Sequence, residues 1–152
     1  MPLAILDDGR TLAQSNAIML HLAEGSRLIP ADAYARAKMY EWLFWEQYNH
    51  EPNIASRRFL VAYLKKPEAE VPAHMLPRGE AALARMELQL KDTRYLVGDA
   101  LTLADIALVA YTRVAEEGGY ALAKYPAVVA WIARVERDLG LAPVQSKRLG
   151  AG

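Results

Sequence analysis

From Asp32 onward the apolar residues recur at helical spacing, and no segment alternates between apolar and polar residues as a β-strand would. Met39, Trp42 and Leu43 begin this pattern. Such a long stretch without strand periodicity restricts the chain to a fold dominated by helices. The sequence therefore predicts a mostly α protein with an all-helical domain over residues 31–143.

The residues before this stretch have a different character. Two short apolar runs, Leu3–Leu6 and Thr11–Ala13, flank Asp8-Gly9, which is a strong signal for a hairpin turn. Ser15 is then expected as the N-cap of a helix. Residues 1–27 thus predict a ββα unit. Because an isolated hairpin leaves an unpaired edge and an apolar face, we expect it to dock on another copy or to be disordered.

Several helices are expected within the helical domain. Pro52 lies inside the first, so that helix should bend or split near residues 50–53. Gly79 slightly weakens the start of another. The expected segments are a helix over 32–64, a polar loop over 67–74, a helix over 76–91 with Leu83, Met86, Leu88 and Leu90 on its buried side, a helix from Pro126, and a flexible tail over 144–152.

Thr102 and Asp105 stand three residues apart directly before an apolar run, which is the spacing of a capping box. The run that follows is apolar on nearly all sides as far as Val114, as expected for a central helix. An acidic residue in apolar surroundings could also act in acid–base chemistry. The capping position favours a structural role for Asp105.

Composition excludes several classes of function. Lysine plus arginine equals aspartate plus glutamate, 18 of each, so no net charge attracts nucleic acid or an anionic membrane. The absence of cysteine removes disulfides, thiolate metal sites and cysteine nucleophiles. Neither a membrane-spanning stretch nor a signal peptide is recognised, so a cytoplasmic location is predicted. His21, His50 and His74 share no ligand spacing, so no metal is expected. Arg57-Arg58 is expected to be a solvated or paired surface charge, and the alternative is that one of these arginines crosses a subunit interface.

A set of motifs spread along the chain resembles the cytosolic glutathione transferase family. The segment from Trp45 to Pro52 is similar to a bacterial branch of that family in particular. The motifs that carry the resemblance are Met1-Pro2-Leu3-Ala4-Ile5-Leu6, Asp8-Gly9, Leu12-Ala13-Gln14-Ser15-Asn16-Ala17-Ile18, Leu96-Val97-Gly98-Asp99, Leu103-Ala104-Asp105-Ile106-Ala107 and Tyr125-Pro126-Ala127.

The resemblance implies a thioredoxin-like domain followed by an all-helical domain, of which this chain holds the final ββα unit and the helices. Complete members typically form dimers and join glutathione, their co-substrate, to small apolar electrophiles. No residue of this chain matches the family's sulfur-activating tyrosine, serine or cysteine, so we expect little or no activity from the chain alone. The alternative is a non-catalytic module that binds a partner protein or a ligand.

The resemblance also assigns site residues. Glutathione would be held by Met1, Pro2, Gln14 and Ser15, with Ser15 on the γ-glutamyl carboxylate and Gln14 on its amine. Read from spacing alone, Ser15 is only an N-cap. The expected substrate-pocket residues are Tyr48, Asn49, His50 and Tyr111, whereas Trp42 and Trp45 are expected to pack in the core.

Overall fold

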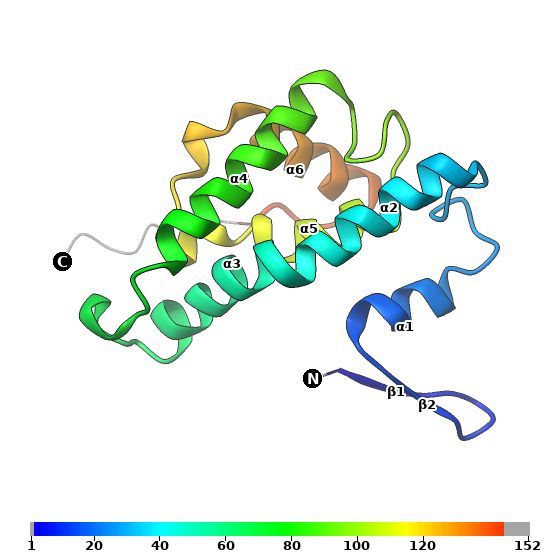
Figure 1. Cartoon of the computed structure of the whole chain (residues 1–152), viewed down its shortest axis with the longest axis horizontal. Coiled ribbons are helices and arrows are strands. Elements are labelled where there is room, and N and C mark those ends of the chain that lie inside the picture. The colour runs from blue at the N-terminus through cyan, green and yellow to red at the C-terminus, as the bar shows by residue number, and fades with distance from the viewer. Residues whose placement is uncertain (1, 145–152) are drawn as a thin grey trace.

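The computed structural model describes residues 2–144 and consists of a small ββα unit beside a bundle of helices (Figure 1). Strands β1 (Leu3–Ile5) and β2 (Thr11–Ala13) pair antiparallel, and helix α1 (Ser15–Leu22) follows. Gly9 has a φ of 84° in the turn, a value that glycine adopts without steric cost. The predicted hairpin is therefore confirmed.

The bundle contains a succession of helical elements, and the prediction of a mostly α chain is confirmed. Their order is α2 (Ala33–Trp45), the π-helical η1 (Glu46–His50), α3 (Glu51–Arg58), the π-helical η2 (Phe59–Tyr63), the 3₁₀ turn η3 (Glu68–Glu70), α4 (Met75–Asp92), α5 (Leu103–Thr112), the 3₁₀ turns η4 (Ala115–Gly118) and η5 (Leu122–Lys124), and α6 (Pro126–Asp138). Most of the predicted tail, residues 145–152, lies outside the described residues, and the domain boundaries stay a prediction.

Pro52 has the predicted effect on the long helical stretch. It occupies the first turn of α3, directly after the wide π turn of η1. Proline has no N–H to donate to the residue four positions earlier, so the regular ladder of hydrogen bonds cannot pass through this point. The stretch is divided into α2 and α3, which follow one another across the molecule (Figure 1).

Helix α5 forms the centre of the bundle. Seven of its ten residues are buried, and α2, α4 and α6 contribute Trp42, Met86 and Trp131 to the same core. The buried side of α4 contains Leu83, Met86 and Leu90, whereas Leu88 is 67% exposed. The prediction that Leu88 contributes to the buried side is wrong, because its side chain points away from the face of α4 that packs against α3 and α6.

The predicted capping box at the start of α5 is confirmed, and its carboxylate makes further contacts. Asp105 is fully buried, and its Oδ2 accepts the N–H of Thr102 at 2.9 Å. Its Oδ1 accepts the N–H of Leu96 at 3.0 Å and the indole N–H of Trp131 at 2.8 Å. One side chain therefore joins α5, the turn before it and α6. Burial raises the pKa of Asp105, although these donors act in the opposite direction.

His50 is also fully buried, at the end of η1. Its Nε2 lies 2.8 Å from the Thr112 hydroxyl, which donates its own proton to the carbonyl of Leu108 at 2.6 Å. The hydroxyl must therefore accept from His50, so Nε2 carries the imidazole proton. Burial lowers the pKa of His50 to about 3, which keeps the ring neutral. The assignment of His50 to a substrate pocket is wrong, because its ring packs inside the bundle.

Arg57 differs from its predicted role as a surface charge. Only 4% of the residue is exposed. Its Nε donates to the carbonyl of Gly118 at 2.8 Å, and its Nη2 donates to the Glu68 carboxylate at 2.8 Å. The guanidinium thus ties α3 to two distant turns. Arg58 agrees better with the prediction, since its Nε pairs with Glu117 at 2.6 Å near the surface.

Asp105→Ala should lower the free energy of unfolding by about 3–5 kcal/mol, because it leaves several buried donors without an acceptor. Asp99→Ala removes an exposed carboxylate nearby and should change the free energy by no more than about 0.5 kcal/mol. Urea denaturation followed by circular dichroism measures both values. Similar losses in the two variants would contradict the central position of Asp105.

The buried, neutral state of His50 predicts a dependence of stability on pH. The unfolded chain protonates this histidine near its ordinary pKa of 6.5, and the folded chain only near 3, so acid favours the unfolded chain. Below pH 6.5, protonation of His50 in the unfolded chain should lower the free energy of unfolding by about 1.4 kcal/mol for each pH unit, as far as about pH 3. His50→Gln retains an N–H donor but does not titrate. The slope of its free energy of unfolding against pH should therefore be smaller than that of the unmodified chain by this amount. Equal slopes from urea denaturation between pH 6 and 4 would contradict the burial.

Candidate functional site

The ββα unit and helix α5 enclose a cavity of about 600 Å³, which we call the α1/α5 cavity. The ββα unit contributes three of the predicted glutathione-binding residues, Pro2, Gln14 and Ser15. Tyr111, a predicted substrate residue, lines the facing wall. The remaining lining residues are Asn16, Met19, Glu46, Gln47, Glu51, Ile106, Ala107 and Ala110. Residues more than ninety positions apart in the sequence therefore meet in one cavity.

The start of α1 differs from the prediction. Gln14 occupies the N-cap position with φ 72° and ψ 121° and makes no side-chain capping bond, so Ser15 is the first helical residue and its predicted N-cap role is wrong. The Ser15 hydroxyl makes no hydrogen bond within residues 2–144. First-turn amides also have no intrahelical partners, so this end of α1 can accept an anion. A positive φ at a non-glycine residue is a strained conformation of the kind found at ligand sites.

Beside the α1/α5 cavity, Asn16 and Glu46 connect α1 to α2 and η1. The Asn16 amide donates to the carbonyl of Leu43 at 3.1 Å and to the Glu46 carboxylate at 3.3 Å. Glu46 is only 3% exposed and also accepts from the Gln47 amide at 2.6 Å. Burial raises the pKa of Glu46. The orientation of α1 against α2 thus depends on a buried polar contact.

A second groove of about 530 Å³, which we call the α3 groove, adjoins the first cavity. Glu51 and Tyr111 line both spaces. The groove is otherwise lined mainly by apolar and aromatic side chains, with Arg58 at one side. Its other lining residues are Ala55, Ser56, Phe59, Leu60, Tyr63 and Met75. A ligand could therefore extend from the α1/α5 cavity, where polar and apolar side chains are mixed, into a mainly apolar groove.

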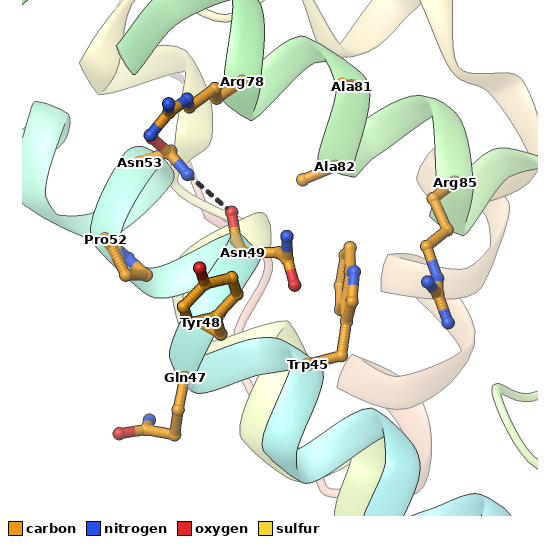
Figure 2. Close-up of a pocket in the computed structure, with 10 residues that line it drawn as sticks. All are labelled: Trp45, Gln47, Tyr48, Asn49, Pro52, Asn53, Arg78, Ala81, Ala82 and Arg85. Carbon is orange, nitrogen blue, oxygen red and sulfur yellow. Dashed lines mark hydrogen bonds between the residues drawn. The ribbon is translucent and has the colours of Figure 1, made fainter. Parts of the chain in front are cut away.

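Tyr48 and Asn49 line a third space, the α2/α4 cavity, of about 570 Å³. Figure 2 shows Tyr48 and Asn49 on one wall and Arg78 and Arg85 from α4 on the other. The Arg85 guanidinium lies 5.0 Å from the centre of the Trp45 ring. Trp42 is buried in the core as predicted. Trp45 is half-buried: it packs against the core, as predicted, and also forms a wall of this cavity.

The four predicted substrate-pocket residues do not share one site. Tyr111 lies on the α1/α5 cavity, Tyr48 and Asn49 lie on the α2/α4 cavity, and His50 is buried between the helices. The expectation that Tyr111 shares a cleft with Tyr48 and Asn49 is therefore wrong. Met1 lies outside the described residues. Glu46 and Glu51 also line the α1/α5 cavity but are not predicted by regular helical spacing. The π turn of η1 brings residues five positions apart to the same side of the helix, whereas an α-helix does so for residues three or four apart.

The described part of the chain, residues 2–144, contains no group of three His, Asp or Glu side chains arranged to hold a metal ion. Within the same residues, none of the helices has the length and apolar character needed to cross a bilayer.

Comparisons with known proteins agree with this architecture. Residues 43–138 match the family model described as glutathione S-transferase, C-terminal domain. The crystal structure of a glutathione S-transferase from Pseudomonas fluorescens is similar with a TM-score of 0.86 and 46% identity, over 90% of this chain and 69% of that one. A possible glutathione S-transferase from Rhodopseudomonas palustris has a TM-score of 0.87 and 42% identity, over 93% and 71% of the two chains.

A curated relative supports the same conclusion. The glutathione S-transferase-like protein LUC7 from Fusarium is 31% identical over 139 residues, which are 84% of this chain and 61% of LUC7. The chain thus spans less than two thirds of the length of that relative. The family match covers more than half of the chain, and the ββα unit and α5 have the arrangement that the resemblance implies. The chain belongs to the glutathione S-transferase family.

Proposed function

We propose that the α1/α5 cavity binds glutathione through its γ-glutamyl end. The observation that carries this proposal is the single cavity that joins Pro2, Gln14 and Ser15 to the wall of α5. The unpaired amides at the start of α1 and the Ser15 hydroxyl offer hydrogen bonds to the γ-glutamyl carboxylate. Gln14 lies beside them and can hold the amine. Pro2 shapes the path of the cysteinyl part, and the role of Met1 there stays a prediction.

The α3 groove is the proposed site of the second substrate, a small apolar electrophile. Its aromatic and aliphatic lining suits an apolar ring, and Tyr111 lies where the two spaces meet. In a complete protein, the glutathione thiol loses its proton to solvent, and the thiolate attacks the electrophilic carbon. A carbon–sulfur bond forms while the bond to a leaving group such as chloride breaks, and chloride departs with the electron pair. We assign no residue of this chain to the activation of sulfur.

Binding of S-hexylglutathione, measured by calorimetry, tests the proposed site. Ser15→Ala should weaken binding about tenfold, because it removes a hydrogen bond to a charged carboxylate. The fold should be unaffected, since the Ser15 hydroxyl makes no hydrogen bond within residues 2–144. Ser26→Ala, which removes a serine from a loop of the same unit, is the matched control and should leave binding unchanged. No binding by the unmodified chain, or equal binding by Ser15→Ala, would contradict the proposal.

Conjugation of glutathione to an aryl chloride tests whether the chain alone is an active enzyme. We infer that the chain alone turns over near the background rate, because no residue matches the sulfur-activating position of the family. Binding without turnover agrees with this inference and also with a module that only binds ligands. Turnover well above background by the purified chain would show that the inference is wrong. The predicted cytoplasmic location stays a prediction.

We infer that the chain forms a homodimer. The highly exposed large apolar side chains include Leu3 and Ile5 on β1 and Phe44 and Tyr48 along α2 and η1. Light scattering after size exclusion should give twice the monomer mass, and Phe44→Glu should shift the chain towards the monomer by placing charge on an apolar contact. Val129→Glu, on an exposed part of α6, should have no such effect. A monomer at all concentrations would contradict the inference.

A further inference from the structure

Two residues form the boundary between the α1/α5 cavity and the α3 groove. Glu51, at the start of α3, and Tyr111, near the end of α5, line both spaces. Both are accessible, since Glu51 is half-buried and Tyr111 is 37% exposed. A ligand that extends from one space into the other must pass between a carboxylate and a phenol.

The carboxylate of Glu51 has no neutralising partner. It makes no hydrogen bond or ion pair with any side chain of residues 2–144. Glu46 interacts electrostatically with Glu51, and the pKa of Glu46 is raised mainly by burial and further by the negative charge of Glu51. Glu46 is itself bonded to Asn16 and Gln47. Neither carboxylate is neutralised by a cationic side chain of residues 2–144, so the pair makes the boundary acidic.

Arg58 does not offset this charge. It is the one cationic residue that lines either space within the described residues. Its Nε is paired with Glu117 at 2.6 Å, and its Nη2 donates to the Tyr63 hydroxyl at 3.2 Å. Because Arg58 is already engaged by a carboxylate, the charge of Glu51 at the boundary is not neutralised by a cationic side chain that lines either space within residues 2–144.

Beyond the boundary the α3 groove suits an aromatic body. Phe59 and Tyr63 stack with ring centres 6.1 Å apart, and both are more than half exposed. Leu60 and Met75 complete an apolar surface beside them. The groove thus favours an apolar ring, whereas the side of that ring nearest the glutathione sulfur would face Glu51.

We propose that Glu51 is a specificity-determining residue that selects electrophiles with a positive or neutral substituent beside the reacting carbon and disfavours carboxylated or sulfonated ones. The proposal rests on the proposed function, since it takes the two spaces as the glutathione and electrophile sites. Two unit charges about 6 Å apart at a partly solvated site interact strongly enough to change affinity severalfold. A cationic and an anionic ligand should therefore differ by about tenfold.

The test uses two glutathione conjugates of similar size that carry the charge beside the carbon bonded to sulfur, S-(2-aminomethylbenzyl)glutathione, which has an ammonium group, and S-(2-carboxybenzyl)glutathione. Calorimetry on the unmodified chain at low salt should show about tenfold tighter binding of the ammonium probe. Glu51→Gln should reduce the ratio to less than about twofold. Glu116→Gln removes an exposed carboxylate of the same domain that lines neither space, and it should leave the ratio unchanged. Added salt should reduce the ratio in the unmodified chain.

The outcomes separate this proposal from the function on which it rests. S-hexylglutathione is uncharged in its alkyl group, so its binding reports the proposed function alone. If it binds while the two charged probes bind equally, or while Glu51→Gln keeps the full ratio, the role of Glu51 is wrong and the glutathione site stands. An equal loss of affinity for all three probes in a folded Glu51→Gln would place the carboxylate on the γ-glutamyl ammonium and overturn the proposal. Failure of S-hexylglutathione to bind overturns both.

Discussion

The buried carboxylate of Asp105 is the contact on which the rest of the molecule depends. It caps α5 through Thr102, fixes the preceding turn through Leu96 and holds α6 through the indole of Trp131. A buried charge of this kind is tolerated only because each oxygen accepts hydrogen bonds. The same helix carries Tyr111 and the small residues that line the α1/α5 cavity, so the cap also determines where that wall of the site lies.

The ββα unit is attached to the bundle by few but specific contacts. The Asn16 amide reaches the carbonyl of Leu43, and the N–H of Leu103 donates to the carbonyl of Leu28 at 3.1 Å. None of the residues of α1 is fully buried. Met19 and Leu20 of α1 are partly buried and pack against the core of the bundle. Placement of Gln14 and Ser15 against α5 therefore depends on these apolar contacts together with the polar contacts at the domain boundary. The proposed glutathione site and the acidic boundary at Glu51 both arise from this placement.

Features set by local chemistry could be predicted from the sequence. The Asp-Gly turn, the break at Pro52 and the capping box of Thr102 and Asp105 each depend on residues within a few positions of one another. Serine is strongly preferred at N-caps, so the sequence predicts Ser15 as the cap of α1, whereas Gln14 takes that position with a strained backbone that leaves no local signal. The resemblance to a family supplied the candidate ligand, which the spacing of these residues does not.

Distant contacts decided the features that the sequence left open. Arg57 and His50 read as surface and pocket residues, yet both are buried because Gly118 and Thr112, about sixty positions away, supply their hydrogen-bond partners. Gly79 reads as a weak point in a helix, but a Cβ there would lie 2.2 Å from the Tyr120 hydroxyl, so the absence of a side chain is what admits that ring.

By itself, the sequence determined the helical class, the hairpin, the break at Pro52 and the capping box of α5, because periodicity and capping act over short distances. Only the tertiary structure decided which side chains share a cavity. That grouping depends on how α1, α3 and α5 pack against one another. The π turn of η1, between α2 and α3, also changes which residues point in the same direction, and regular helical spacing does not predict this change.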